Sequence, residues 1–282
     1  MFENFCLIEG EHKTTGYRWD VKAPTHVMCI IHGIGEHAGR YDRVAGILNE
    51  AGIEVISMDL LGHGLSAGKR GHTAPRNLVL DNVTEMLRYA KKEFPDIPLT
   101  LYGHSMGGNI CFDYLFRGEA NSLPDKYIIS APWLRLVRTV PKPLIATLKA
   151  FSHIAPSLAI NSGCKPKDLG NMKNVSSYAT DPQVHPYITL KCAVEGNDVA
   201  EAICSGIHEN NHGADGKPLL LMHGSEDRIC SVEGSRIVAA QRRNDPNFTY
   251  IEWPGYYHEI HNGGAEATGE KVIETIRDFV KE

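Results

Sequence analysis

The 282-residue sequence lacks both a long apolar run and a cluster of basic residues. No apolar run approaches the ~18 residues that a membrane-spanning helix needs. The 29 basic and 34 acidic residues are mixed along the chain, with a formal net charge of −5, so no basic surface for nucleic acid is indicated. The N-terminal residues contain no basic segment followed by an apolar one, so we expect no secretory signal and a cytoplasmic location, with attachment to a membrane surface as an alternative.

Paired cysteines and metal-binding motifs are also missing. The seven cysteines are odd in number and widely scattered, which is typical of reduced thiols in a cytosolic protein. The segments His208-Glu-Asn-Asn-His212 and His258-Glu-Ile-His261 look like metal motifs, but neither is H-E-x-x-H in helix-forming sequence. We therefore expect neither a metal nor a cofactor.

The sequence does contain an alternation of short apolar runs and amphipathic segments. Continuous apolar runs are typical of strands buried on both faces, and alternating strands and helices predict an α/β fold with a mostly parallel sheet of eight strands and helices on both faces. The predicted strands are 2–9, 17–21, 26–31, 54–58, 99–102, 126–130, 218–223 and 248–253. The predicted helices are 41–51, 76–94, 109–117, 232–243 and 265–281.

This alternation breaks between residues 133 and 213, where three helical pieces and many prolines predict a helical cap inserted into the sheet domain. The predicted organisation is an α/β core over 1–132 and 214–282, with the cap (133–213) between them. Residues 143–160 carry apolar side chains at roughly helical spacing, with basic residues nearby. That apolar face is expected to fold onto the protein's own site, although contact with bilayers or micelles is a compatible alternative.

The most informative motif is G-x-S-x-G in Leu99-Thr-Leu-Tyr-Gly-His-Ser-Met-Gly-Gly108. It lies between a predicted buried strand and a predicted helix. A serine on such a sharp turn is lifted out of the sheet with its hydroxyl exposed, and the flanking glycines let the turn close. Ser105 is therefore the candidate nucleophile.

A serine nucleophile needs a base and an orienting carboxylate, which follow in the order Ser, Asp or Glu, His in this type of fold. Asp227 follows the predicted strand 218–223, and His258 follows the strand 248–253. All three would lie beyond the same sheet edge. Glu226 is an alternative to Asp227. The backbone N–H groups of Met106 and Ile34 are the expected donors to the oxyanion.

These motifs resemble the monoacylglycerol lipase branch of the α/β-hydrolases, including lysophospholipase-like bacterial members. The segment His32-Gly-Ile-Gly-Glu-His-Ala-Gly-Arg-Tyr41 is similar to that family's HGxGEHxxRY signature, and Ser177-Tyr-Ala-Thr-Asp-Pro182 to its cap. The resemblance supports the triad and the oxyanion donors named above. It also implies that Glu36, Arg40, Tyr178 and His261 lie near the pocket for the polar head of the substrate.

The predicted function is hydrolysis of carboxylic esters of single-chain lipids, most simply monoacylglycerol, through an acyl-enzyme. A lysophospholipase, a short- or medium-chain carboxylesterase and an acyl amide or thioester hydrolase are alternatives with the same chemistry. A catalytically silent binding protein of the same fold is an alternative of another class. The expected partner is a small lipid ester.

Overall fold

An eight-stranded sheet forms the centre of the protein in the computed structural model, which describes residues 2–206 and 216–282. The segment His208-Glu-Asn-Asn-His212, which was compared with metal-binding motifs above, lies outside these residues. The strand order is β1 (Glu3–Ile8), β2 (Thr14–Trp19), β4 (Ile53–Met58), β3 (His26–Ile31), β5 (Leu99–His104), β6 (Lys126–Ser130), β9 (Leu219–Gly224), β10 (Phe248–Trp253). Neighbours from β4 to β10 are parallel, whereas β2 is antiparallel to both β1 and β4. The predicted α/β fold with a mostly parallel eight-stranded sheet is confirmed.

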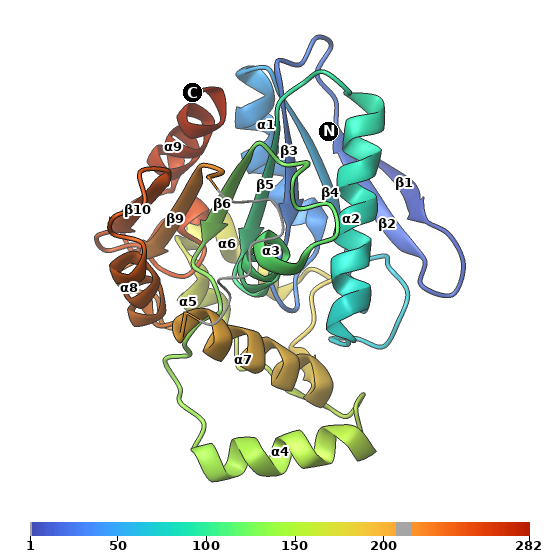
Figure 1. Ribbon diagram of the computed structural model, residues 1–282, viewed down its shortest axis with the longest axis vertical. Helices are drawn as coiled ribbons and strands as arrows, with labels where there is room; N and C mark the ends of the chain where they lie inside the picture. The colour runs from blue at the N-terminus through green and yellow to red at the C-terminus, as the bar shows by residue number, and fades with distance from the viewer. Residues whose placement is uncertain (1, 207–215) are drawn as a thin grey trace.

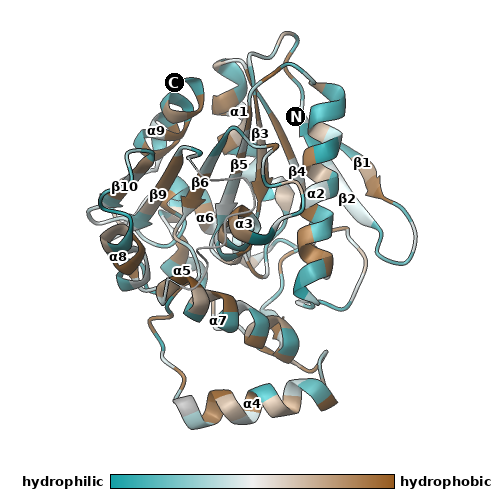
Figure 2. Ribbon diagram, in the orientation of Figure 1, coloured by the Kyte–Doolittle hydropathy of each residue, from teal (hydrophilic) through white to brown (hydrophobic). Residues whose placement is uncertain are grey.

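Helices cover both faces of this sheet (Figure 1). One apolar cluster joins the sheet to α1 (Asp42–Glu50) and α9 (Glu270–Lys281), and a second joins it to α2 (Arg76–Glu93), α3 (Met106–Arg117) and α8 (Val232–Gln241). Every residue of β4, β5 and β9 is buried. The apolar run of β9 follows from this two-sided burial, and β3 and β9 are coloured mainly brown in Figure 2. Strands β4 and β5 also bury the polar side chains of Glu54, Ser57 and Thr100.

Several element ends differ from the prediction: β2 is Thr14–Trp19 rather than 17–21, and α3 begins at Met106 rather than at residue 109. Two further differences have a clear local cause. Strand β5 continues to His104, because Gly103 and His104 still pair with β6 although neither is apolar. The last helix begins at Glu270 rather than at residue 265. Gly263 and Gly269 have φ of 90° and 91°, a conformation that cannot continue a right-handed helix, so the chain turns here before the helix starts.

The connection between β6 and β9 forms the helical cap. It comprises α4 (Lys142–Ile154), β7 (Ala159–Asn161), α5 (Pro166–Leu169), α6 (Met172–Val175), β8 (Tyr187–Thr189) and α7 (Leu190–Cys204). Helix α4 packs against α7 and lies farthest from the sheet, at the bottom of the view in Figure 1. The antiparallel pair β7–β8 was not predicted, because strands of three residues are too short to show a periodic pattern.

All seven cysteines are free, and five of them are buried. Burial raises the pKa of the Cys29 and Cys111 thiols above their usual value, so these side chains behave as small apolar groups of the core. Among the described residues, none of the helices combines the length and the apolar character required to span a membrane.

Candidate active site

Ser105 lies on a strained turn between β5 and α3. Its φ of 58° and ψ of −117° are rare for a residue with a side chain. The turn is held by the Ser105 N–H, which donates to the Ser130 carbonyl at 3.0 Å, and by the Trp133 N–H, which donates to the Ser105 carbonyl at 3.0 Å. A Cβ at Gly103 or Gly107 would overlap backbone atoms, so the helix reaches the sheet only with glycine at both positions.

The structure brings Ser105, His258 and Asp227 into one hydrogen-bonded row. The Oγ atom of Ser105 is 2.8 Å from Nε2 of His258, and Nδ1 of His258 is 2.6 Å from Oδ2 of Asp227. The three side chains come from the ends of β5, β9 and β10, and all are buried. The sequence predicted Ser105, Asp227 and His258 beyond the same edge of the sheet, and the structure places their side chains in contact there.

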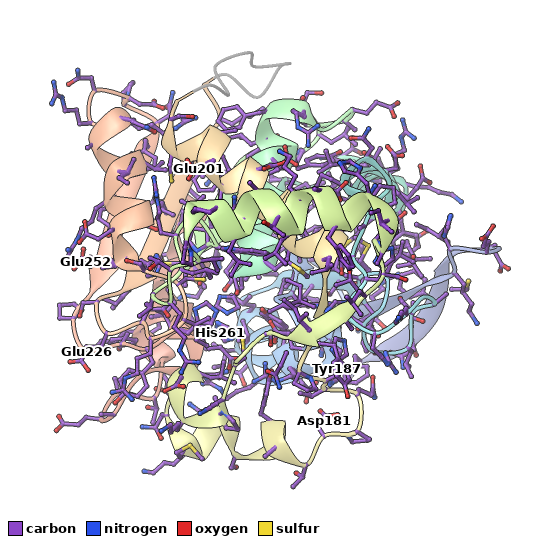
Figure 3. All side chains as sticks on the ribbon, turned by 90° about the horizontal axis from the view of Figure 1, so that it is seen from below. Asp181, Tyr187, Glu201, Glu226, Glu252 and His261 are labelled. Atoms are coloured by element: carbon purple, nitrogen blue, oxygen red, sulfur yellow. The ribbon has the colours of Figure 1, made fainter. Side chains whose placement is uncertain are left out.

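The two candidate carboxylates have different surroundings. Asp227 is buried and accepts backbone N–H groups of Ile229 and Cys230 on Oδ1, at 2.8 and 2.9 Å. Glu226 is exposed and lies at the edge of the molecule (Figure 3). The geometry therefore pairs Asp227 with His258 and leaves Glu226 outside the row.

Opposite charges set the protonation of this row. Burial would raise the pKa of Asp227, but His258 and the hydrogen bonds from His223 and His258 outweigh it and hold that pKa well below its usual range. Burial would lower the pKa of His258, but the Asp227 carboxylate outweighs it and raises the pKa above the usual 6.5. Asp227 is therefore ionised, and His258 is poised to accept a proton.

Two backbone N–H groups lie beside Ser105 without an acceptor. Met106 is the first residue of α3, so its N–H has no acceptor within the helix. Ile34 lies in the loop after β3, and its N–H donates to no other group in 2–206 or 216–282. Its neighbours hold this loop: the Gly33 N–H donates to Glu36 at 2.6 Å, and the Gly35 N–H donates to Nε2 of His63 at 3.0 Å.

Glu36 and Arg40 are engaged with each other and with a third charged residue, Glu259. Nη1 of Arg40 lies 2.5 Å from Glu36 and 2.7 Å from Glu259, and Nη2 lies 2.9 Å from the second oxygen of Glu259. Among the described residues, Glu36, His104 and Glu259 are the group close enough to hold a cation. Because Arg40 already donates to both carboxylates, its guanidinium supplies the positive charge there.

A small polar cavity lies beside these residues and Ser105. Its volume is about 10 Å³, and Glu36, Glu259, His104, Tyr178 and Cys164 are among its lining residues. Such a volume holds about one water molecule. Arg40 and His261, which the resemblance also assigns to this region, are not in the lining of either described cavity.

The side chains of Arg40 and His261 lie behind that lining. The Arg40 guanidinium stacks on the ring of Tyr178 at 4.7 Å, and the His261 ring stacks on Tyr41 at 5.3 Å. Burial lowers the pKa of His261 to about 4, so this imidazole is neutral. Glu259 and His104 were missed by the sequence reasoning. Each directly adjoins a predicted triad residue in the sequence, but no pattern shows which distant side chains it meets.

A larger cavity opens on the other side of Ser105, between the sheet edge and the cap. Its volume is about 250 Å³ and its lining is mainly apolar. Side chains from the cap and from the sheet edge contribute to it, among them Trp133, Leu136, Val140, Ile145, Leu148 and Ile188. A long apolar group can be buried here while its polar end lies at Ser105.

Fold and site together define the class: a serine on a strained strand–helix turn, at the carboxyl edge of this type of sheet, is characteristic of an α/β-hydrolase. The chain belongs to the serine aminopeptidase S33 family of hydrolases, whose family model matches residues 22–264.

The chain is also similar to individual lipases. It is 31% identical over 262 residues to a monoacylglycerol lipase of Mycolicibacterium smegmatis, covering 91% of this chain and 88% of that protein. It is 29% identical over 274 residues to Phospholipase YtpA of Bacillus subtilis, covering 93% and 98%. A solved monoacylglycerol lipase of Paleococcus ferrophilus superposes with a TM-score of 0.78 at 30% identity, covering 94% and 98%. The chain is accordingly a carboxylic ester hydrolase.

Proposed function

We propose that the protein hydrolyses carboxylic esters of single-chain lipids, with monoacylglycerol as the preferred substrate. The observation that carries this proposal is the position of Ser105 between two unlike cavities, one apolar and large, the other polar and small. One long acyl chain matches the apolar cavity. The small cavity holds about one water molecule, so it can take a single hydroxyl group of the head and not the whole head. Burial of each methylene contributes about 0.8 kcal/mol, so the apolar cavity can supply several kcal/mol of binding.

In the proposed mechanism, Ser105 attacks the ester carbonyl while His258 takes its proton, and Asp227 orients the imidazole and stabilises the imidazolium. The N–H groups of Ile34 and Met106 donate to the oxyanion. These donors are already held in place, so no reorganisation is needed as the negative charge develops. His258 then returns the proton to the leaving alcohol, and a water molecule activated by His258 releases the fatty acid.

The acceptors that line the polar cavity support a head group that carries hydroxyls. The carboxyl oxygens of Glu36 and Glu259 line this cavity and can accept hydrogen bonds from hydroxyl groups. Arg40 already donates to both carboxylates, so its guanidinium is not free to bind a phosphate. Acidic side chains at this place therefore disfavour a phosphate. The second candidate, a lysophospholipase, is favoured by the similarity to Phospholipase YtpA. An amide substrate is the third candidate, since the family description names a serine aminopeptidase.

We further propose that the cap contacts the lipid surface from which the substrate is drawn. Helix α4 directs Ile145 and Leu148 toward the apolar cavity but leaves Leu144, Phe151 and Ile154 exposed, by 48%, 46% and 79%. Leu148 is four residues after Leu144 and three before Phe151, so cavity-lining and exposed side chains lie next to each other around this helix. Both alternatives from the sequence thus have side chains to support them. An exposed apolar face of this kind favours an interfacial position.

The test measures hydrolysis by the wild type and Ser105→Ala on five substrates. These are a long-chain monoacylglycerol, the corresponding lysophosphatidylcholine and diacylglycerol, a short-chain ester and an aminoacyl anilide. The product followed is the fatty acid for the lipid substrates, the short-chain acid for the short ester and the aniline for the anilide. We expect preference for monoacylglycerol and a loss of about 10⁶-fold in the variant. Preference for the lysophospholipid or the anilide would overturn the substrate assignment. Full activity of Ser105→Ala, or no labelling of wild-type Ser105 by a fluorophosphonate, would overturn the mechanism.

A further inference from the structure

A second serine–histidine pair contacts the same oxygen of Asp227 as His258 does. His223, at the end of β9, has Nε2 3.1 Å from Oδ2 of Asp227, and its Nδ1 is 2.7 Å from Oγ of Ser235 on α8. The order Ser235, His223, Asp227 thus mirrors the order Ser105, His258, Asp227. Both His223 and Ser235 are fully buried and line neither described cavity, so this second pair does not meet the substrate.

The neighbours of His223 define which nitrogen carries the proton. Nε2 lies between two acceptors, the Asp227 carboxylate and the carbonyl of Cys230, each at 3.1 Å. Nε2 therefore bears a hydrogen in this arrangement. Nδ1 faces only the Ser235 hydroxyl, which donates to it. Replacing Ser235 would remove the donor that favours this tautomer.

With this donor included, Asp227 accepts four hydrogen bonds. Oδ1 accepts the N–H groups of Ile229 and Cys230, and Oδ2 accepts those of His223 and His258. A carboxylate has about four acceptor sites, so all are occupied and the group cannot rotate without losing a partner. Both donors on Oδ2 are stabilised by its negative charge. The same charge stabilises the His258 imidazolium that forms when His258 takes the proton.

We propose that His223 is a positioning residue that fixes Oδ2 of Asp227 toward His258 and moderates its negative charge, with Ser235 holding the required tautomer. This inference rests on the proposed function, since it gives Asp227 and His258 their triad roles. His223 acts only through Asp227 and does not touch the reacting atoms.

The charges around His223 do not compete with this role. Glu252 on β10 is the register partner of His223, but its carboxylate pairs with Arg236 of α8 at 2.6 Å. The thiol of Cys230 is buried, and burial raises its pKa well above the usual value, so it stays neutral. The groups that donate hydrogen bonds to Oδ2 of Asp227 are therefore the two histidines.

The test compares the full-length variants His223→Leu, His223→Gln and Ser235→Ala in fatty-acid release and in the rate of fluorophosphonate labelling. Leucine removes the donor, whereas glutamine can place an N–H where Nε2 lies. We expect His223→Leu to lower kcat/KM about tenfold, the scale of one hydrogen bond to a charged group, with KM unchanged. We expect glutamine to restore most of this loss and Ser235→Ala to cause a smaller one.

The pH profile distinguishes positioning from general loss of stability. Without the His223 donor, Oδ2 carries more charge, so the pKa of His258 rises and the acid limb of kcat/KM moves to higher pH. Thr84→Val is the matched control, because it removes a buried 2.9 Å hydrogen bond to Tyr114 far from the site and should leave the limb in place.

An unmoved acid limb in folded His223→Leu, or equal losses in the leucine and glutamine variants, would overturn the proposal. If His223→Leu does not fold, the glutamine and Ser235→Ala profiles decide by the same criterion. Failure of the proposed triad mechanism would look different, because wild-type Ser105 would then not react with the probe at all. Failure of the substrate assignment alone would appear as preference of the wild type for another ester or for the anilide.

Discussion

The sheet edge and the cap meet at Ser105 but are built differently. At the sheet edge, the reactive side chains are buried and tied to backbone groups or to each other by hydrogen bonds of 2.5–3.1 Å. In the cap, helix α4 contacts the rest of the protein through a narrow face, and large apolar side chains remain exposed, with Ile154 at 79%. Chemistry is thus assigned to the part with fixed geometry, and substrate selection to the part with spare apolar surface.

This difference follows from the demands of the two tasks. An oxyanion donor or a general base must be held within a fraction of an ångström of its productive position, which requires many satisfied polar contacts. An acyl chain requires only apolar surface and volume, which many side chains supply equally well. Substitutions in the two regions should therefore change different kinetic parameters.

The largest expected effect comes from replacing the carboxylate at the sheet edge that orients the imidazole of His258. Asp227→Asn should lower kcat by about 10⁴-fold, because an amide no longer favours the required tautomer of His258. Glu226→Gln, one residue earlier and exposed, should leave kcat unchanged. Steady-state kinetics on both variants checks this, and equal losses would contradict the assignment.

The next effect concerns the stability of the sheet edge. Arg40→Met leaves the buried carboxylates of Glu36 and Glu259 without their cation, which should lower the free energy of unfolding by about 3–5 kcal/mol. Denaturant unfolding measures this loss. Arg236→Met removes an arginine that also bridges two glutamates but at the surface, and its unfolding midpoint should hardly move.

In the cap, a change of cavity volume should affect selectivity and leave the chemistry intact. Leu148→Trp fills part of the apolar cavity, so the kcat/KM for a long-chain ester should fall about 10–200-fold relative to a short-chain ester. Ile154→Ser, on the exposed face of the same helix, should retain activity on monomeric substrate. If Leu148→Trp lowered both esters equally, the division between cap and sheet edge would be wrong.

The smallest expected effect is a displacement of the acid limb. His258 must be neutral to act as a base, so kcat/KM falls as the pH drops through the pKa of His258. Because this pKa is raised above the usual 6.5, the midpoint of the loss should lie above pH 6.5. The negative charge of Glu259 contributes to this elevation, so Glu259→Gln should move the limb to lower pH by a few tenths of a unit. Glu266→Gln, which is exposed, serves as the control for the pH profiles.

The sequence was sufficient to predict the fold class and the residues that meet in the hydrogen-bonded row. Buried parallel strands produce apolar runs that are visible locally, and Ser105, Asp227 and His258 each directly follow such a run or lie within a few residues of it. The sequence already favoured Asp227 over Glu226, and the structure adds the physical reason: Asp227 is buried against His258, whereas Glu226 is exposed.

Glu259 could not be found, since its partner Arg40 is distant in sequence. His223 could not be found although Asp227 and Ser235 are near in sequence, because no periodic pattern shows that the three side chains point at one another.

The glycines at 103 and 107 have a consequence for anyone who wishes to adapt this protein to new esters. Both positions admit no side chain, so random mutagenesis across the strand–helix turn would mostly yield unfolded chains. Diversity is better introduced at the residues of the cap that line the apolar cavity, such as Ile145 and Leu148 of α4. A library confined to α4 would sample many binding surfaces above one unchanged reaction centre.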